Sequence, residues 1–524
     1  MISKYYLNAG KAPDLKSPRE RIIYRCLEIL PGFLSWTTLV LVLVFSHLKP
    51  VWVAVFIIIF DFYWFLRAIH FSIHLIFTYR KMKKNLQTDW MGKLKKLKAP
   101  DIYHLIIFPM YKEPYEVVKG SFNALLKSDY PKDKMIVVLA TEERAGKYAQ
   151  EISEKIKKEF GDKFLRFLVT VHPKDIIGEI AGKGSNETWA GKKAKKVIDE
   201  LKIPYENIIV SCFDIDTQVG EKYFSCLTYY YLTSRKPTRT SFQPIPLYNN
   251  NIWQAPLFSR LVATCNVFWQ MFQQSRPEKL ITYSSHSMSF KALVEMGFWQ
   301  TNVVSEDAGV FLKAFLFYNG DYYIVPLFYP ISMDACVDKT FFKTVISQYR
   351  QQRRWAWGVE GIPYLLFGFL KDTILKIKSR TGNKHKKLKF MSWRKKFRYT
   401  ILLLGGFYSW AVAALIILTG GWLPVILGGK EFNVTLLSYN LPRLTGQIMT
   451  LAVIGVFVCA VIGSLLLPPR PKNSSRIKAI FVVLQWIFLP VTMIVFGAIP
   501  ALEAQTRLMF GKYMGFWVTP KVRK

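Results

Sequence analysis

The sequence predicts a multi-pass membrane protein that carries one doubly wound, mainly parallel α/β domain. Three observations lead to this fold class. Hydrophobic residues make up 51% of the 524 residues, more than the core of an ordinary soluble domain requires. Charge-free runs of membrane-spanning length stand towards both ends of the chain. Between them, β-type runs alternate with amphipathic helical stretches, which is typical of an α/β sheet.

The apolar runs reach the roughly 20 residues that cross a hydrocarbon layer of ~30 Å. They cover residues 29–48, 50–79, 399–429, 444–469 and 479–502. The first run is too long, and the segment before it too polar, for a cleaved signal peptide, so we expect a retained anchor. Asp61 and Arg67 interrupt the second run; because charge at membrane depth is costly, Asp61 is either functional or paired within the helix bundle.

The charge distribution indicates where the polar part of the chain lies. Lys and Arg number 72 against 36 Asp and Glu, a net charge of +36. The basic clusters at 80–98 and 376–398 adjoin apolar runs, as the positive-inside rule predicts for cytoplasmic segments that also attract anionic membrane lipids. This placement argues against nucleic acid as the partner. The six cysteines show no CxxC spacing, which favours a reducing cytosol and argues against structural zinc.

These features divide the chain into segments. Residues 1–29 form a cytoplasmic N-terminal segment, and residues 30–79 a transmembrane hairpin. Residues 80–340 form the cytoplasmic α/β domain, and residues 341–396 interfacial helices. Residues 397–502 form the C-terminal membrane segments, and residues 503–524 a C-terminal tail. Because the tail is basic and Pro490 and Pro500 can bend the last apolar run, we expect four full crossings and a cytoplasmic C-terminus.

Within the α/β domain, strands are expected at residues 102–108, 135–140, 164–171 and 207–213. Helical stretches follow the first two, at 115–127 and 144–160. The first of these helices carries Val118, Phe122 and Leu125 on one face, as a helix covering a sheet should. Ligands of doubly wound sheets bind beyond the carboxyl ends of the strands, so the chemistry is expected there.

Two aspartates follow the strand at 207–213. In an extended segment Asp214 and Asp216 point to the same side, and two like charges so close favour a cation between them. Hard carboxylate oxygens select Mg²⁺ or Mn²⁺, which can bridge a diphosphate. The alternative reading is an Asp-rich turn that ends the strand.

Two further motifs stand towards the end of the domain. Ser305, Glu306 and Asp307 precede an apolar helical run, either as a catalytic group or only as an acidic helix start. If "SQYRQQRRWAWG" (347–358) is helical, one face presents an amide, a guanidinium and an indole. The guanidinium suits a phosphate group, and the indole offers a flat surface for a sugar ring. These side chains are Gln351, Arg354 and Trp355. An interfacial helix with snorkelling arginines is the alternative, and opposite faces can serve both roles.

Together these motifs resemble those of membrane-integrated family 2 glycosyltransferases, the group of cellulose, chitin and hyaluronan synthases. The resemblance runs from about residue 102 to residue 357 and implies a GT-A-like domain. "PMYKEP" places Tyr111 and Glu113 at the nucleotide, and Lys183 resembles the lysine that contacts the diphosphate. In "ATEE" the family often has paired aspartates, so either Glu142 or Glu143 could meet the base or uridine.

The remaining motifs follow in the family's order. By match, Asp214 and Asp216 form the DxD that binds sugar and metal, and Asp307 in "SED" is the catalytic base. "QQRRW" matches QxxRW on the acceptor side through Gln351, Arg354 and Trp355. The tail "FWVTPK" has the FxVTxK form of the cellulose synthase gating loop, which places Thr519 and Lys521 near the substrate.

The resemblance implies a hexosyl- or N-acetylhexosaminyltransferase of the cell (plasma or inner) membrane. It would move a sugar, with inversion, from a nucleotide-sugar donor, UDP-linked, to a growing polysaccharide at the cytoplasmic face. The implied cofactor is Mg²⁺ or Mn²⁺. Transfer of a single sugar to a lipid acceptor is the alternative, and a transporter or membrane scaffold with a degenerate α/β domain is the alternative of another class. The donor sugar and any partner subunit stay open.

Overall fold

The computed structural model of the protein describes residues 4–381, 390–471, 482 and 484–523. The chain starts with a long helical hairpin, α1 (Pro18–Leu48) and α2 (Pro50–Gln87), followed by the short α3 (Trp90–Lys95). Proline stands in the first turn of both long helices, where its missing backbone donor costs nothing. The hairpin turns at Lys49, between the two apolar runs that the sequence predicted.

An eight-stranded sheet follows the hairpin, in the order β3-β2-β1-β4-β7-β6-β8-β5. The strands are β1 (Tyr103–Pro109), β2 (Met135–Glu142), β3 (Arg166–His172), β4 (Ile208–Cys212), β5 (Gln218–Val219), β6 (Thr240–Leu247), β7 (Ser287–Ser289) and β8 (Tyr323–Ser332). The four strands predicted from the sequence are confirmed as β1 to β4, which pair in parallel.

The other half of the sheet is mixed, but four of the seven described strand pairings are parallel, so the expectation of a mainly parallel sheet is confirmed. β7 pairs antiparallel with β4 and β6, β5 pairs antiparallel with β8, and only β6 and β8 pair in parallel. β6 and β8 each contain two prolines, and proline lowers the strand signal of a sequence because it gives no ladder hydrogen bond. For this reason the local residue pattern does not predict β6 and β8 as strands.

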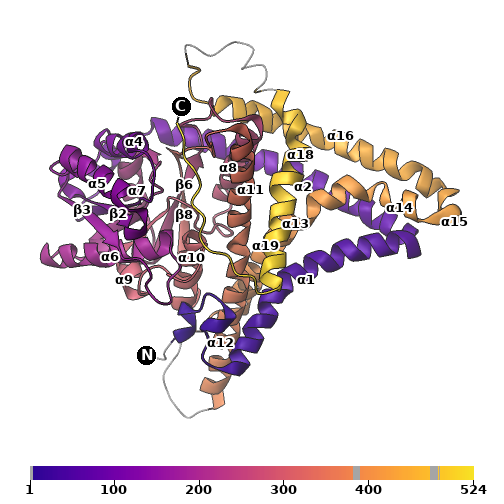
Figure 1. Cartoon of the computed structure of the whole chain (residues 1–524), viewed down its shortest axis with the longest axis horizontal. Coiled ribbons are helices and arrows are strands. Elements are labelled where there is room, and N and C mark those ends of the chain that lie inside the picture. The colour runs from indigo at the N-terminus through magenta and orange to yellow at the C-terminus, as the bar shows by residue number, and fades with distance from the viewer. Residues whose placement is uncertain (1–3, 382–389, 472–481, 483, 524) are drawn as a thin grey trace.

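Helices cover both faces of the sheet (Figure 1). They are α4 (Tyr115–Leu126), α5 (Lys147–Phe160), α6 (Lys183–Glu200), α7 (Tyr223–Thr233), α8 (Leu257–Gln274), α9 (Phe290–Glu295) and α10 (Glu306–Phe317). Successive residues of β1 enter two different cores: Leu105 packs on the side of α6, and Ile106 on the side of α4 and α5. The doubly wound arrangement is therefore confirmed, and it leaves the carboxyl ends of β1, β2 and β4 at one edge.

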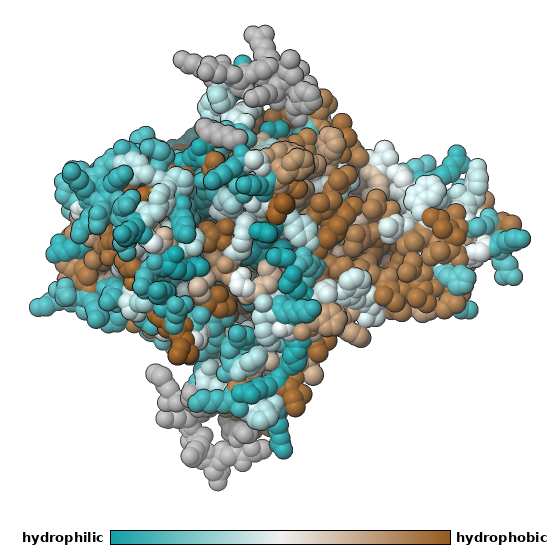
Figure 2. All heavy atoms as spheres, in the orientation of Figure 1, coloured by the Kyte–Doolittle hydropathy of each residue, from teal (hydrophilic) through white to brown (hydrophobic). Residues whose placement is uncertain are grey.

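The C-terminal part consists of helices on the side away from the sheet (Figure 1). They are α11 (Phe341–Ala356), α12 (Gly361–Thr381), α13 (Trp393–Gly420), α14 (Leu423–Leu427), α15 (Gly429–Asn433), α16 (Leu436–Leu465), α18 (Leu489–Met493) and α19 (Ile499–Met509). Among the described residues, five helical segments are long and apolar enough to cross a membrane. Figure 2 shows hydrophobic residues gathered over this half of the molecule, whereas the sheet domain is largely hydrophilic.

The last of these segments, Gln485–Met509, differs from the others in its course. It is interrupted by a π-helical turn at Ile494–Ala498, and it lies beside α11, whereas α16 extends away from the sheet (Figure 1). Arg260 Nε at the start of α8 donates to Gln485 Oε1 (2.9 Å), and Arg353 of α11 pairs with Glu503 (2.7 Å). Both ends of the segment thus contact elements next to the sheet domain. Residues 479–481 and 483 of the predicted run lie outside the described residues.

Candidate active site

A buried lysine lies at the centre of the candidate site. Lys183 is the first residue of α6, and its Nζ lies 2.8 Å from Asp307 Oδ1 and 2.8 Å from Asp214 Oδ1. Glu187 Oε1 and Glu306 Oε1 are each 3.6 Å from the same ammonium. One cation therefore joins carboxylates from three elements: the end of β4, the start of α6 and the start of α10. The carboxylates raise the pKa of Lys183 against the opposing effect of burial.

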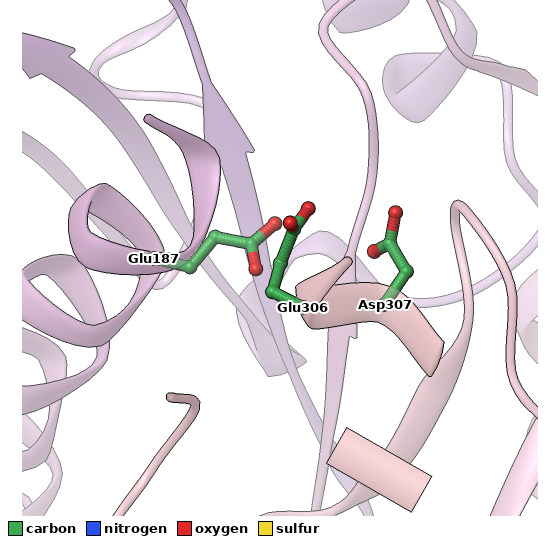
Figure 3. Close-up of side chains that lie close together, drawn as sticks. All are labelled: Glu187, Glu306 and Asp307. Atoms are coloured by element: carbon green, nitrogen blue, oxygen red, sulfur yellow. The ribbon is translucent and has the colours of Figure 1, made fainter. Parts of the chain in front are cut away.

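Three of these carboxylates form a compact group. Figure 3 shows Glu187 on α6 facing Glu306 and Asp307 at the start of α10, and one ligand oxygen from each lies within 4.8 Å of the others. Burial, and then the charge of Asp307, raises the pKa of Glu306 to about 8. Burial also raises the pKa of Glu187, neither of whose carboxylate oxygens has a hydrogen-bond partner among the described residues. Burial thus disfavours the charged form of both glutamates.

The start of α10 was expected to be either catalytic or only a helix cap. Ser305 occupies the N-cap position, but its side chain makes no capping hydrogen bond. Instead the backbone N–H groups of Val304 and Ser305 donate to Glu360 Oε1 (2.9 and 2.8 Å). Glu306 and Asp307 do form an acidic first turn of α10, and Asp307 also pairs with Lys183 (2.8 Å).

The two aspartates of the DxD motif have different surroundings. Asp214 follows β4 outside any strand, and Asp216 lies in a turn, so the extended arrangement expected from the sequence is not present. Asp214 Oδ2 accepts a hydrogen bond from Ser284 Oγ (2.7 Å), and Lys183 lowers its pKa despite burial. Asp216 is 1% exposed and pairs with Lys521; burial raises its pKa to about 6. Each aspartate thus has its own ammonium partner.

The C-terminal tail lies across the site (Figure 1). Besides the Lys521–Asp216 ion pair, the backbone at Lys521 forms a parallel bridge with Val337. Thr519 Oγ1 accepts a hydrogen bond from Gln351 Nε2 (3.4 Å). The tail segment "FWVTPK" therefore reaches the DxD motif from more than 300 residues away along the sequence.

The QxxRW motif lies on α11, which confirms the predicted helix. The guanidinium carbon of Arg354 lies 4.8 Å from the centroid of the Phe516 ring in the tail. The rings of Trp355 and Tyr248 have their centroids 6.0 Å apart. Gln351 and Arg354 both face the tail, so the helix brings the amide and the guanidinium to one surface as expected.

The residues expected at the nucleotide lie at the ends of β1 and β2. The backbone N–H of Tyr111 donates to Glu113 Oε2 (2.7 Å), and the guanidinium carbon of Arg144 lies 4.6 Å from the Tyr111 ring centroid. Arg144 also pairs with the buried Glu142. Glu143 instead accepts from a backbone N–H outside this group, that of Lys174. Of the two glutamates, Glu142 is the one placed beside Tyr111.

Several site residues had no motif in the sequence. Glu187 stands four residues after Lys183, and this spacing was the one available signal. Buried His286 has its Nδ1 3.9 Å from Asp307 Oδ1, and Asp334 pairs with Arg523 of the tail (2.8 Å). No local sequence pattern predicts either contact, because each joins residues that are not neighbours along the chain.

Comparisons with known proteins identify part of the chain. Residues 209–426 match the sequence model of the family described as "Glycosyl transferase family group 2". No curated protein matches the chain. The matched segment contains the DxD, SED and QxxRW motifs, although it covers less than half of the chain.

Solved glycosyltransferase structures overlap with the chain at low similarity. One is the mannosyltransferase PcManGT from Pyrobaculum calidifontis, in complex with GDP-Man and Mn²⁺: 14% identity, TM-score 0.38, covering 87% of this chain and 100% of that one. Another is S. aureus TarS 1–349 in complex with UDP-GlcNAc: 11% identity, TM-score 0.37, covering 79% and 93%. The chain is thus similar over residues 209–426 to the sequence model of family 2 glycosyltransferases, in a protein that joins a mixed α/β sheet to long apolar helices that could span a membrane.

Proposed function

We propose that the chain is an inverting glycosyltransferase that moves a sugar from a UDP-linked donor to a growing polysaccharide at the cytoplasmic face of the cell membrane. One observation carries the proposal: Lys183 joins Asp214 of the DxD motif to Asp307 of the SED motif at 2.8 Å each. The two motifs therefore share one small volume beyond the carboxyl end of β4. Such a volume is where a donor sugar and an acceptor hydroxyl would meet.

Asp307 is the proposed base. It accepts the proton of an acceptor hydroxyl as that oxygen attacks the anomeric carbon from the face opposite the leaving diphosphate. Lys183 positions its carboxylate through contacts to both oxygens (2.8 and 2.9 Å). Arg354 of α11, whose guanidinium lies over the Phe516 ring of the tail, is the group that we propose neutralises charge on the diphosphate.

The residues of the DxD motif fit a hard divalent cation. Asp214 and Asp216 offer hard carboxylate oxygens, and a bound cation would take the place of the ammonium groups of Lys183 and Lys521 that pair with them. When bound there, Mg²⁺ or Mn²⁺ supplies positive charge for the leaving diphosphate. The group of Glu187, Glu306 and Asp307 is the other donor set, but the Lys183 ammonium lies within 3.6 Å of all three.

The contacts of the two chain ends support the membrane arrangement. Lys4 Nζ donates to the carbonyl oxygens of Leu316 and Phe317 (2.8 Å each), and Lys521 pairs with Asp216. Both ends therefore contact the sheet domain, which supports an even number of crossings. We infer that four of the five candidate segments cross and that Gln485–Met509 lies along the interface. The basic segments next to the domain favour the cytoplasm for that side.

A donor panel tests the proposal. The detergent-purified full chain is incubated with several nucleotide sugars, with and without EDTA, and nucleotide release and product length are measured. We expect release with a UDP-sugar, loss of release in EDTA and a product of many sugars. Release with a product of one sugar on a lipid would favour the lipid-acceptor alternative. No nucleotide release with any donor in native membranes would favour a transporter or scaffold. Full release in EDTA would show that the reaction does not need a divalent metal ion.

A further inference from the structure

A group of basic side chains lies outside the candidate active site, on α2, just after α8 and at the start of α13. We call it the Arg67 cluster. It consists of Arg67, His70, His74, Arg276, Lys279 and Arg398. Neither the proposed transfer reaction nor the family motifs use any of these residues.

The cluster is organised around one buried ring. The centroid of Phe272 on α8 lies 4.4 Å from the guanidinium carbon of Arg276 and 6.0 Å from that of Arg67. The ring centroids of His70 and His74 are each 5.6 Å from it and 4.3 Å from one another. Ser275 Oγ lies 2.8 Å from His74 Nδ1, which ties α2 to the end of α8. The geometry is therefore built by packing and is not a set of loose surface side chains.

The positive charge of the cluster is poorly compensated. Burial and then the charge of Arg67 lower the pKa of Arg276, and burial and then Arg276 lower that of Lys279. Exposed Glu278 is the carboxylate within electrostatic reach of both. Among the described residues, no ion pair joins the four Arg and Lys side chains of the cluster to a carboxylate. Like charges held together in this way favour an anion between them.

The position of the cluster along α2 points to the membrane surface. Arg67 lies about 25 Å along the helix from Pro50, at 1.5 Å per residue, and a hydrocarbon layer is ~30 Å thick. The α2 face next to Arg67 exposes large apolar side chains: Phe62, Tyr63, Leu66, Ile69 and Ile73. On α13, Trp393 and Phe397 are exposed beside Arg398, as aromatic residues at a membrane interface are. An anion at the cluster would thus lie at headgroup depth, with acyl chains against α2.

We propose that the Arg67 cluster binds the phosphate of an anionic phospholipid whose acyl chains pack along the exposed apolar face of α2. Guanidinium groups bind phosphate oxygens through two parallel N–H donors, and the Phe272 ring holds the two arginines in place. General attraction between a basic protein and an anionic membrane would act equally on other arginines of the same helices. Arg80 of α2 and Arg394 of α13 are such residues, since both are exposed and outside the cluster.

Lipid binding to the full chain tests the proposal. The protein is stripped in a neutral detergent and titrated with phosphatidylglycerol or phosphatidylcholine, and bound lipid is counted by native mass spectrometry. We expect Arg67→Gln with Arg276→Gln to weaken phosphatidylglycerol binding by on the order of tenfold or more. The matched control, Arg80→Gln with Arg394→Gln, should bind as the unmodified chain does. Equal weakening in both pairs, or in neither, would overturn the proposal.

A footprint on the unmodified chain covers the case in which the glutamine pair does not fold. Phenylglyoxal modification of Arg67 and Arg276 is measured by peptide mass spectrometry in nanodiscs of phosphatidylcholine alone, with phosphatidylglycerol, or with added inorganic phosphate. Protection by phosphatidylglycerol alone is expected. Equal protection by inorganic phosphate would show that the cluster binds free phosphate and would overturn the proposed lipid site. Equal modification under all three conditions would show that the cluster binds no anion.

Discussion

At the residue level, the charge of the site depends on the balance around Lys183. Its ammonium contacts Asp214 and Asp307 directly at 2.8 Å and reaches Glu187 and Glu306 at 3.6 Å. Burial raises the pKa of Glu187 and Glu306, whereas the half-buried Asp214 and Asp307 lie directly against the ammonium. This leaves the aspartates as the groups that can interact with a cation or accept a proton.

The role of Asp307 as base gives the first prediction. Asp307→Asn keeps the shape of the side chain but removes the proton acceptor, so we expect turnover to fall by roughly 10² or more with donor binding retained. Initial rates of nucleotide release and donor titration measure the two quantities. Asp199→Asn, in an exposed ion pair with Lys195 on α6, is the control and should be active. Near-normal turnover in Asp307→Asn would remove this residue from the mechanism.

The raised pKa of Glu306 gives a pH prediction. A carboxyl group with a pKa of about 8 in the folded protein and an ordinary value of 4.5 holds its proton more tightly when folded. The free energy of unfolding therefore decreases as the pH rises through this window. Glu306→Gln removes the titration, so we expect a smaller decrease in thermal midpoint between pH 5 and 8, measured in detergent. Exposed Glu116→Gln is the control; identical slopes in Glu306→Gln and the unmodified chain would contradict the prediction.

At the level of elements, the tail and α11 form one surface over the DxD motif. The tail contacts α11 through Thr519 and Phe516 and contacts the segment after β8 through Lys521 and Arg523. The Lys521 ammonium lies on the same Asp216 carboxylate that the proposed cation needs. Docking of the tail in this position and binding of a cation at Asp216 therefore compete.

This competition is testable with a single substitution. Lys521→Met keeps the length of the side chain and removes its charge, so Mn²⁺ affinity should rise by roughly 5-fold or more, the lower range of coupling between competing ligands. Electron paramagnetic resonance of free Mn²⁺ measures this without reference to activity. Exposed Lys512→Met, in the same tail, should leave the affinity unchanged. Equal affinity in Lys521→Met and the unmodified chain would show that the two do not compete.

At the level of the whole molecule, the contacts of the two ends bear on the proposed number of membrane crossings. The N-terminal segment contacts α10 and its following turn, and the tail contacts the sheet edge, so five crossings are incompatible with both contacts. The interrupted helix Gln485–Met509 is the segment whose two ends both contact elements beside the sheet domain. In the proposed topology this segment lies along the membrane interface beside α11, and the other four candidate segments cross.

Cysteine labelling tests this topology. A cysteine added after Lys524 in a cysteine-free background should not react with a membrane-impermeant maleimide in intact cells and should react after permeabilisation. Lys430→Cys, in α15 at the far end of the helices from the sheet, is the matched control and should react in intact cells. Labelling of the C-terminal cysteine in intact cells would place the tail outside and remove it from the site.

Part of this architecture follows from local patterns in the sequence. Strands β1 to β4, helix α11 and the apolar segments were predicted because periodicity, length and composition act over neighbouring residues. The DxD, SED and QxxRW motifs were also local, and they marked Asp214, Asp307 and Arg354 as candidates. The mixed half of the sheet was missed because prolines in β6 and β8 weaken the same local signal.

What the sequence by itself determined was therefore the class of the protein: an α/β domain with acidic strand ends, joined to apolar helices. Only the tertiary structure decided which charges meet. Lys183 and Asp307 are 124 residues apart, Asp216 and Lys521 are 305 apart, and no local pattern records either pair. Such contacts form because the packing of distant elements leaves buried carboxylates that must find a cation, and burial makes an unpaired charge too costly to keep.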